Sequence, residues 1–166
     1  MVQSILYATD LGLYSPYVLQ HALSLARSFG AQLHVVHAVE PFSLFAESVL
    51  QTYVEETRLR DLREKGMQVV LESIRQRVLE SFREEMQDAG HDMQLIASLQ
   101  VVQGDPPQVI LDEANRLGVE LVVVGSHSHG TAWDAPLGRT ALRLLQLAEV
   151  PVYLVPMLQH RGRGDF

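Results

Sequence analysis

Residues 4–10 read SILYATD, a short apolar run that ends in an acid, and Gly12 follows two residues later. A continuous apolar run bounded by turn signals is typical of a strand that is buried on both faces of a parallel sheet. Ser15 and Pro16 then have the pattern of a helix N-cap followed by proline at the first helical position. Apolar residues recur at helical spacing from there to Gly30. The chain therefore opens with a predicted strand, a loop and a helix.

The same alternation continues to the end of the chain. Four further strands are predicted, over residues 32–39 (QLHVVHAV), 95–102, 120–124 (ELVVV) and 151–155 (PVYLV, from Pro151 to Val155). Helical periodicity separates them. Strands that alternate with helices of about 10 to 20 residues predict right-handed crossovers and a parallel sheet between two layers of helices. The fold class is therefore α/β.

The helical signals between the strands differ in strength. Residues 45–86 are helical, with a predicted core stripe at Met67, Val70, Leu71, Ile74, Val78, Phe82 and Met86. Residues 50–63 are charge-rich and form either a separate helix or a mobile excursion, with Gly66 as the expected break. Further on, Asp105 and Gln108 have the spacing of a capping box, and Gly118 is the expected C-cap.

Composition limits the possible functions. The chain has 166 residues, 47% hydrophobic and 20% charged, which fits one folded domain. It has no cysteine, which excludes disulfides, thiolate metal sites and a cysteine nucleophile. Lys65 is the only lysine, so a P-loop lysine is absent. The net charge of −7 argues against nonspecific nucleic-acid binding.

Targeting signals are not apparent in the sequence. No basic start leads into an apolar run, and no stretch approaches the roughly 20 apolar residues that span a bilayer. We therefore expect a soluble, cytoplasmic protein without a membrane partner. One domain is expected over residues 1–157, followed by a polar tail at 158–166.

Ligands of open α/β sheets bind beyond the carboxyl ends of the strands. In this chain those ends carry Thr9-Asp10, Ala38-Val39, Gln103-Gly104 and Gly125-Ser126. The loop over residues 125–138 leads into a predicted helix N-terminus, whose free N–H groups suit a phosphate. Neither GxGxxG nor GxxxxGK[ST] occurs, so a phosphate site must be of another design.

Four stretches together resemble the landmarks of the universal stress protein family, in the family's order. They are ILYATD (5–10), VVQGDP (101–106), GVELVVVGSHS (118–128) and LGRTALRLLQLAEVPVYLVP (137–156). The resemblance implies an open five-stranded parallel sheet in the order 3-2-1-4-5 with helices on both faces, the adenine-nucleotide alpha-hydrolase-like fold. It also implies a homodimer formed through the last strand, residues 151–155, and an unidentified protein partner.

The resemblance also implies a nucleotide site, for ATP with or without Mg²⁺. The implied binding residues are Ala8, Thr9, Asp10, Ala38, Gly104, Gly125, Ser126, His127, Ser128, Gly138, Arg139 and Thr140. Asp10 would bind the ribose, Ala8 and Ala38 would line the adenine slot, and Gly104 would give backbone contacts. No catalytic residue and no metal ligand is assigned.

Two positions depart from the family's phosphate motif, which is glycine, two residues, glycine, nine residues, glycine, then serine or threonine. Counted from Gly125, Ser128 replaces the second glycine and Arg139 replaces the hydroxyl residue. The Cβ of Ser128 would crowd a phosphate, whereas Arg139 would supply a permanent charge. The loop's His127 and His129 favour polarity or a phosphate contact over a metal, and Trp133 is expected to be a packing residue.

Three functions follow, in order of preference. The first is an ATP-binding regulatory dimer in the stress response. The second is a family member that has lost nucleotide binding and acts as a protein-interaction dimer. The third, a slow ATPase or self-phosphorylating protein, ranks last because no nucleophile, general base and orienting residue occur together.

Overall fold

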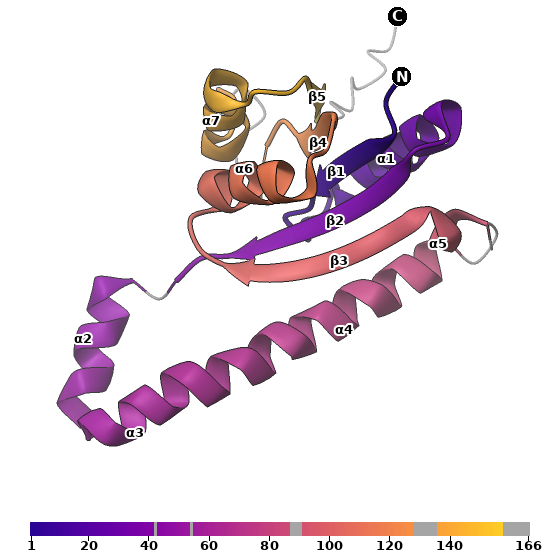
Figure 1. The fold of residues 1–166 in the computed structure, drawn as a ribbon. Helices are drawn as coiled ribbons and strands as arrows, with labels where there is room; N and C mark the ends of the chain where they lie inside the picture. Colours follow the sequence, from indigo (N-terminus) through magenta and orange to yellow (C-terminus); the bar gives the residue numbers. More distant parts are fainter. Residues whose placement is uncertain (42, 54, 87–90, 128–135, 158–166) are drawn as a thin grey trace, which may run out of the picture.

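The sheet has five strands. The structure, a computed structural model, describes residues 1–41, 43–53, 55–86, 91–127 and 136–157. The strands are β1 (Ser4–Ala8), β2 (Gln32–Val39), β3 (Ile96–Gln103), β4 (Leu121–Gly125) and β5 (Val152–Val155). All paired strands run parallel, in the order β3-β2-β1-β4-β5 (Figure 1). This confirms the α/β fold class and the expected strand order.

Helices cover both faces of the sheet. They are α1 (Ser15–Phe29), α2 (Leu44–Tyr53), α3 (Glu56–Asp61), the π-helical η1 (Leu62–Gly66), α4 (Met67–Glu85), α5 (Asp92–Leu95), α6 (Pro106–Leu117) and α7 (Arg139–Leu147). The buried residues of α1 and α4 belong to one core cluster, and Val109, Ile110 and Ala114 of α6 and Leu144 of α7 belong to the other. The protein therefore has three layers, with the sheet in the middle.

The residues of β1 explain why this strand is central. Ile5 and Tyr7 pack in the cluster with α1 and α4, whereas Leu6 and Ala8 pack in the cluster with α6 and α7. Ile5, Leu6 and Tyr7 are each at most 1% exposed. A strand buried on both faces needs apolar residues at every position, as the sequence predicted.

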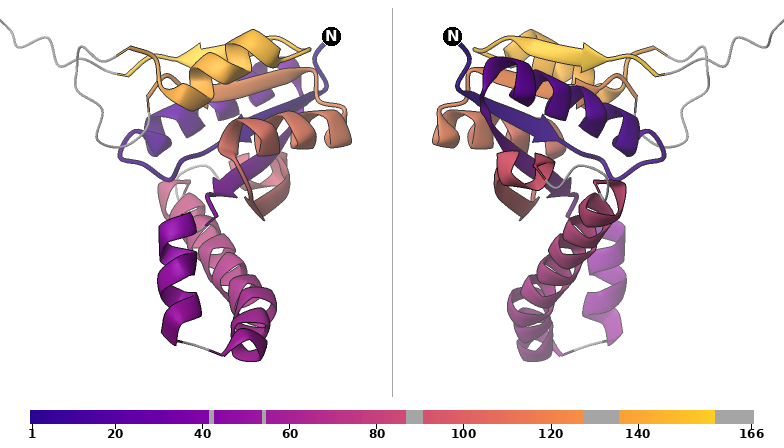
Figure 2. Two further views of the ribbon diagram at one scale, coloured as in Figure 1. Left: turned by 90° about the vertical axis from the view of Figure 1, so that its left-hand side faces the viewer. Right: turned by 90° about the vertical axis from the view of Figure 1, so that its right-hand side faces the viewer.

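The segment between β2 and β3 differs from the prediction. Helix α2 ends at Tyr53 and α3 begins at Glu56, so the break precedes Gly66, which has helical dihedral angles (φ −68°, ψ −39°). The expectation of a break at Gly66 is therefore wrong. As Figures 1 and 2 show, α2, α3, η1 and the beginning of α4 extend away from the sheet.

The apolar stripe of α4 reaches the core along only part of its length. Val78 and Phe82 are buried, and Ile74 is partly buried against the same cluster. Val70, predicted as core, is 48% exposed, because this end of the helix projects beyond the sheet. The predicted core stripe is thus correct from Ile74 onward and wrong at Val70.

Helix caps follow the sequence at the C-termini but not at the N-termini. Gly30 and Gly118 end their helices in the left-handed conformation, as predicted (φ 64° and 60°). The N-cap of α1 is Tyr14, not Ser15. Asp105 is the N-cap of α6 but makes no side-chain cap hydrogen bond, so the predicted capping box is wrong.

Two further predictions concern membrane spans and the C-terminal residues. No helix in the described parts of the chain is long and apolar enough to cross a membrane. The predicted polar tail, residues 158–166, lies outside those parts, and the domain boundary at residue 157 stays a prediction.

Candidate functional site

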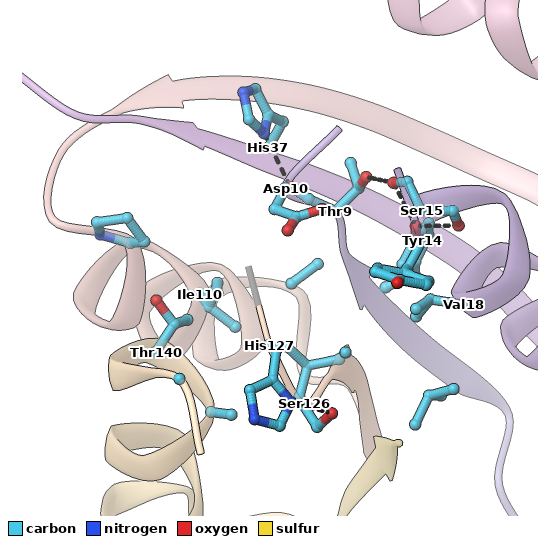
Figure 3. Close-up of a pocket in the computed structure, with 18 of the residues that line it drawn as sticks. Thr9, Asp10, Tyr14, Ser15, Val18, His37, Ile110, Ser126, His127 and Thr140 are labelled. Atoms are coloured by element: carbon cyan, nitrogen blue, oxygen red, sulfur yellow. Dashed lines mark hydrogen bonds between the residues drawn. The ribbon is translucent and has the colours of Figure 1, made fainter. Parts of the chain in front are cut away.

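A pocket of about 370 Å³ opens at the carboxyl ends of the central strands. Its walls come from the ends of β1, β2 and β4, from the beginnings of α1, α6 and α7, and from the residues after β5 (Figure 3). Its size falls in the range of small-molecule sites. From β1 the chain adds β2 and β3 on one side of the sheet and then β4 and β5 on the other side. The pocket lies at this reversal of strand order, which is where open parallel sheets bind ligands.

The turn after β1 is held by its own side chains. The Thr9 hydroxyl accepts a hydrogen bond from the Leu11 N–H (3.1 Å) and lies 2.5 Å from the Ser15 hydroxyl. Asp10 Oδ1 accepts the Gly12 N–H at 2.8 Å. Leu11, between them, adopts φ +57°, a conformation that residues with a Cβ rarely adopt. These bonds place the exposed Asp10 carboxylate at the pocket.

The neighbouring strand adds a second support for this turn. His37 Nδ1 lies 2.8 Å from the Thr9 carbonyl oxygen. Because a carbonyl only accepts, Nδ1 carries the proton. The backbone just before Asp10 is therefore tied to β2 by a side chain that itself lines the pocket.

Tyr7 forms part of the pocket wall. Its hydroxyl donates to the Ser15 carbonyl oxygen at 3.0 Å. Burial raises the pKa of Tyr7 to about 12, because the phenolate would lose its hydration. Tyr7 is therefore a neutral residue that connects β1 to the start of α1.

Ser126 connects three chain segments at the opposite wall. Its N–H donates to the Val155 carbonyl at 2.8 Å, and its hydroxyl accepts the Met157 N–H at 2.9 Å. Its carbonyl accepts the Gly138 N–H, also at 2.9 Å. The side chain lies 2.7 Å from His127 Nδ1. Ser126 thus fixes the start of α7 relative to the ends of β4 and β5.

The N-terminus of α7 faces the pocket. Gly138 and Thr140 line it, and the first intrahelical bond runs from Leu142 N to Gly138 O. The N–H groups of the three residues between have no acceptor within the helix, as at every helix start. Together with the helix dipole, they suit an anionic group.

Arg139 lies at the edge of the pocket rather than inside it. Its guanidinium donates to Asp105 Oδ1 at 2.6 Å, and the two side chains are 66% and 50% exposed. Asp105 immediately precedes α6, so the pair joins the first turns of α6 and α7. Three chain neighbours of the pair, Pro106, Gly138 and Thr140, do line the pocket.

Gly104 also lies outside the pocket lining. Its N–H donates to the Val39 carbonyl at 2.9 Å, which joins the ends of β2 and β3. A Cβ at this position would lie 2.7 Å from Val109 Cγ2. Glycine is thus required here for the close approach of α6, not for a contact with a ligand.

Most of the residues expected in the site do meet in one pocket. The predicted residues that line it are Ala8, Thr9, Asp10, Ala38, Gly125, Ser126, His127, Gly138 and Thr140. Gly104 and Arg139 do not line it. Ser128, His129 and Trp133 lie outside the described residues.

Several pocket residues were not predicted. Tyr14 and Tyr17 come from the start of α1, and His37 and Glu40 from the end of β2. Met157 follows β5. The rule that carboxyl ends of strands bear the site would have found His37 and Glu40, because they flank the predicted Ala38.

The described pocket lining has carboxylate and imidazole side chains but lacks the lysine or arginine that often binds phosphate. It contains the carboxyl groups of Asp10 and Glu40 and the imidazoles of His37 and His127, and it contains no lysine or arginine. Within the described ranges, no three histidine or acidic residues are grouped closely enough to hold a metal ion. The described lining therefore offers an anion backbone N–H groups, including those at the α7 N-terminus, together with hydroxyl and imidazole donors, but no ammonium or guanidinium group.

Comparison with known proteins agrees with this geometry. The model of the universal stress protein family matches residues 1–156. The chain belongs to the universal stress protein family. It is 28% identical over 156 residues to the universal stress protein YxiE of Bacillus subtilis (strain 168), covering 93% of this chain and 99% of that protein.

Solved structures of universal stress proteins and related chains share the fold. The hypothetical protein MJ0577 has a TM-score of 0.70 at 20% identity, with 96% of this chain and 99% of that chain covered. A family member from Burkholderia pseudomallei has a TM-score of 0.57 at 24% identity, with 94% and 97% covered. A universal stress protein in complex with cAMP has a TM-score of 0.55 at 15% identity, with 93% and 97% covered.

Proposed function

We propose that this universal stress protein is a regulatory protein that binds an adenine nucleotide, ATP in the first instance, in the pocket at the carboxyl ends of β1 and β4. The observation that carries the proposal is the convergence of Asp10, Ala38 and the α7 N-terminus on that pocket. These are the groups that the family resemblance assigns to ribose, adenine and phosphate.

The geometry supplies a role for each part of the ligand. The Asp10 carboxylate accepts hydrogen bonds from ribose hydroxyls, and the Gly12 N–H bond holds it in place. Ala8, Ala38 and Ile110 give an apolar slot for the base. The N–H groups at the start of α7 receive the phosphates. That a universal stress protein of the same fold was solved with cAMP supports an adenine nucleotide as the ligand class.

The active form that we propose is a homodimer through β5. This strand is an edge of the sheet, and Tyr153 on it is 36% exposed. Leu142 and Leu145 of the adjoining α7 are 45% and 47% exposed. Antiparallel pairing of two β5 strands would satisfy both edges and cover apolar surface in one symmetric contact.

A second candidate, a dimer that binds protein partners without nucleotide, is favoured by one observation. Arg139, the cation that the sequence offers to phosphates, is paired with Asp105, and the described lining has neither lysine nor arginine. Under this candidate the pocket has no nucleotide function.

Thermal unfolding with ATP, ADP, AMP and adenosine tests the proposal. A ligand that binds the native state stabilises it by mass action and so raises the melting temperature. At a free ligand concentration of 100 times Kd the added free energy of unfolding is about 2.7 kcal/mol. We expect a concentration-dependent rise with adenine ligands and none with the matching guanine ligands. Equal melting curves with and without each adenine ligand at millimolar concentration would favour the second candidate.

A further inference from the structure

The ion pair between Asp105 and Arg139 is specific to this chain's departure from the family motif. Arg139 stands where the motif has serine or threonine, and its partner lies 34 residues earlier in the sequence. Both residues lie at the start of a helix: Asp105 directly precedes α6, and Arg139 is the first residue of α7. The pair therefore joins two helix N-termini at the edge of the pocket.

The carboxylate of Asp105 is committed to this pair. As the N-cap residue of α6 it could accept a hydrogen bond from that helix, yet it makes none. Gln108, its predicted capping partner, bonds to Asp112 instead. One Arg139 N–H donates to Asp105 Oδ1 at 2.6 Å, so this donor is not available to a phosphate oxygen while the pair is intact, and the carboxylate offsets the charge of the guanidinium.

Arg139 has no substitute among the described residues that line the pocket. The described lining contains Asp10 and Glu40 but no lysine or arginine. Residues 128–135, which follow His127, read SHGTAWDA and likewise include neither. Among the described lining groups a polyphosphate therefore meets two carboxylates and no guanidinium, and Asp105 competes with it for Arg139.

We propose that Asp105 is a specificity-determining residue that holds Arg139 and so lowers the affinity of the site for long phosphate chains relative to the nucleoside. The inference rests on the proposed nucleotide function and adds which ligands the site prefers. Adenosine, which needs no phosphate contact, is insensitive to the pair. ATP competes with Asp105 for the guanidinium, and the effect of the pair on ATP affinity is modest, because exposed ion pairs are weak.

Calorimetric titration of adenosine and ATP into four proteins tests this: the wild type, Asp105→Asn, Arg139→Ala and the double variant. Asparagine keeps the shape of Asp105 and its capacity to cap α6. We expect Asp105→Asn to tighten ATP binding by about three- to tenfold and to change adenosine binding less than twofold. The gain should disappear in the double variant, because it acts through Arg139.

Asp112→Asn is the matched control. It removes one negative charge from the same helix, and Asp112 bonds to Gln108 rather than to Arg139. We expect it to leave the ratio of ATP to adenosine affinity unchanged. A gain in ATP affinity that equals that of Asp112→Asn, or that persists in the double variant, would overturn the role of Asp105. The role of Asp105 would also be overturned if Asp105→Asn bound adenosine but had the same ratio of ATP to adenosine affinity as the wild type. Absence of adenosine and ATP binding in all proteins would instead refute the nucleotide function itself, and this inference with it.

Discussion

Gly104 is a position at which one added methyl group should destabilise the fold. Its Cβ would lie 2.7 Å from Val109 Cγ2, closer than real Cβ contacts. Val109 is 7% exposed and β-branched within α6, so it has little freedom to change rotamer. Overpacking of this kind costs about 1–3 kcal/mol, and the glycine's φ of 159° adds about 1 kcal/mol.

Gly104→Ala should therefore lower the free energy of unfolding by about 3 kcal/mol, which corresponds to about 6–12 °C in Tm for a chain of this size. Urea and thermal unfolding measure both quantities. Gly118→Ala is the matched control, because its φ is 60° but no heavy atom lies within 4 Å of the added Cβ. It should cost only about 1 kcal/mol.

A double-mutant cycle with Val109→Ala isolates the steric contribution. Val109→Ala removes the methyl group that the new Cβ meets, so its own cost should be at least about 1 kcal/mol smaller in the Gly104→Ala protein than in the wild type. Additive effects, or equal losses for Gly104→Ala and Gly118→Ala, would show that close packing of α6 against this turn is not what requires glycine.

Two other predictions concern a buried hydroxyl and the sheet edge. The pKa of Tyr7 is raised above its unfolded value to about 12, so the contribution of the neutral phenol to the free energy of unfolding is complete below pH 10 and is lost as the pH rises toward 12. Between these pH values the wild type should lose about 2–3 kcal/mol more stability than Tyr7→Phe. Parallel profiles of stability against pH for the two proteins would contradict this. Tyr153→Glu on β5 should dissociate the proposed dimer in sedimentation at tens of micromolar, whereas Tyr53→Glu on α2, where tyrosine is 83% exposed, should not. A monomeric wild type would refute the dimer.

The strands and the parallel sheet could be predicted because each step depended on local signals and a general rule, whereas the strand order 3-2-1-4-5 was implied by the resemblance to universal stress proteins. Buried strands such as residues 4–8 are apolar at every position, and glycine ends α1 and α6 in the left-handed conformation. The convergence of Asp10, Ala38 and Gly125 then follows, because parallel strands end at the same edge.

Asp105 is the N-cap of α6 as expected, but the hydrogen bonds of the expected capping side chains could not be predicted, because partners outside their own helices take them. Ser15 was expected to cap α1, but Tyr14 is the N-cap, and the Ser15 hydroxyl lies against Thr9 in the turn after β1. Asp105 was expected to bond within α6, but Arg139, 34 residues later, takes its carboxylate. Spacing rules describe the helix alone and contain no information on such contacts.

Local sequence patterns also could not predict the break after α2 or the length of α4 that packs on the sheet. Gly66 is helical in spite of its low helix propensity, because propensity is a weak prior. The periodicity of α4 is regular along its length, yet Val69 and Val70 are 69% and 48% exposed. How much of an amphipathic helix packs on the sheet depends on where the sheet ends.

The central claim is that the pocket binds an adenine nucleotide through Asp10, and calorimetric titration of adenosine into the wild type and Asp10→Asn tests it most directly. Asparagine keeps an oxygen for the Gly12 N–H, so the turn is preserved while the charged acceptor is lost. Hydrogen bonds to charged groups contribute about 1.5–3 kcal/mol, so we predict one site per chain in the wild type and binding weakened by about 10- to 150-fold in the variant. Equal affinities in the two proteins, or no saturable binding to the wild type, would contradict the account.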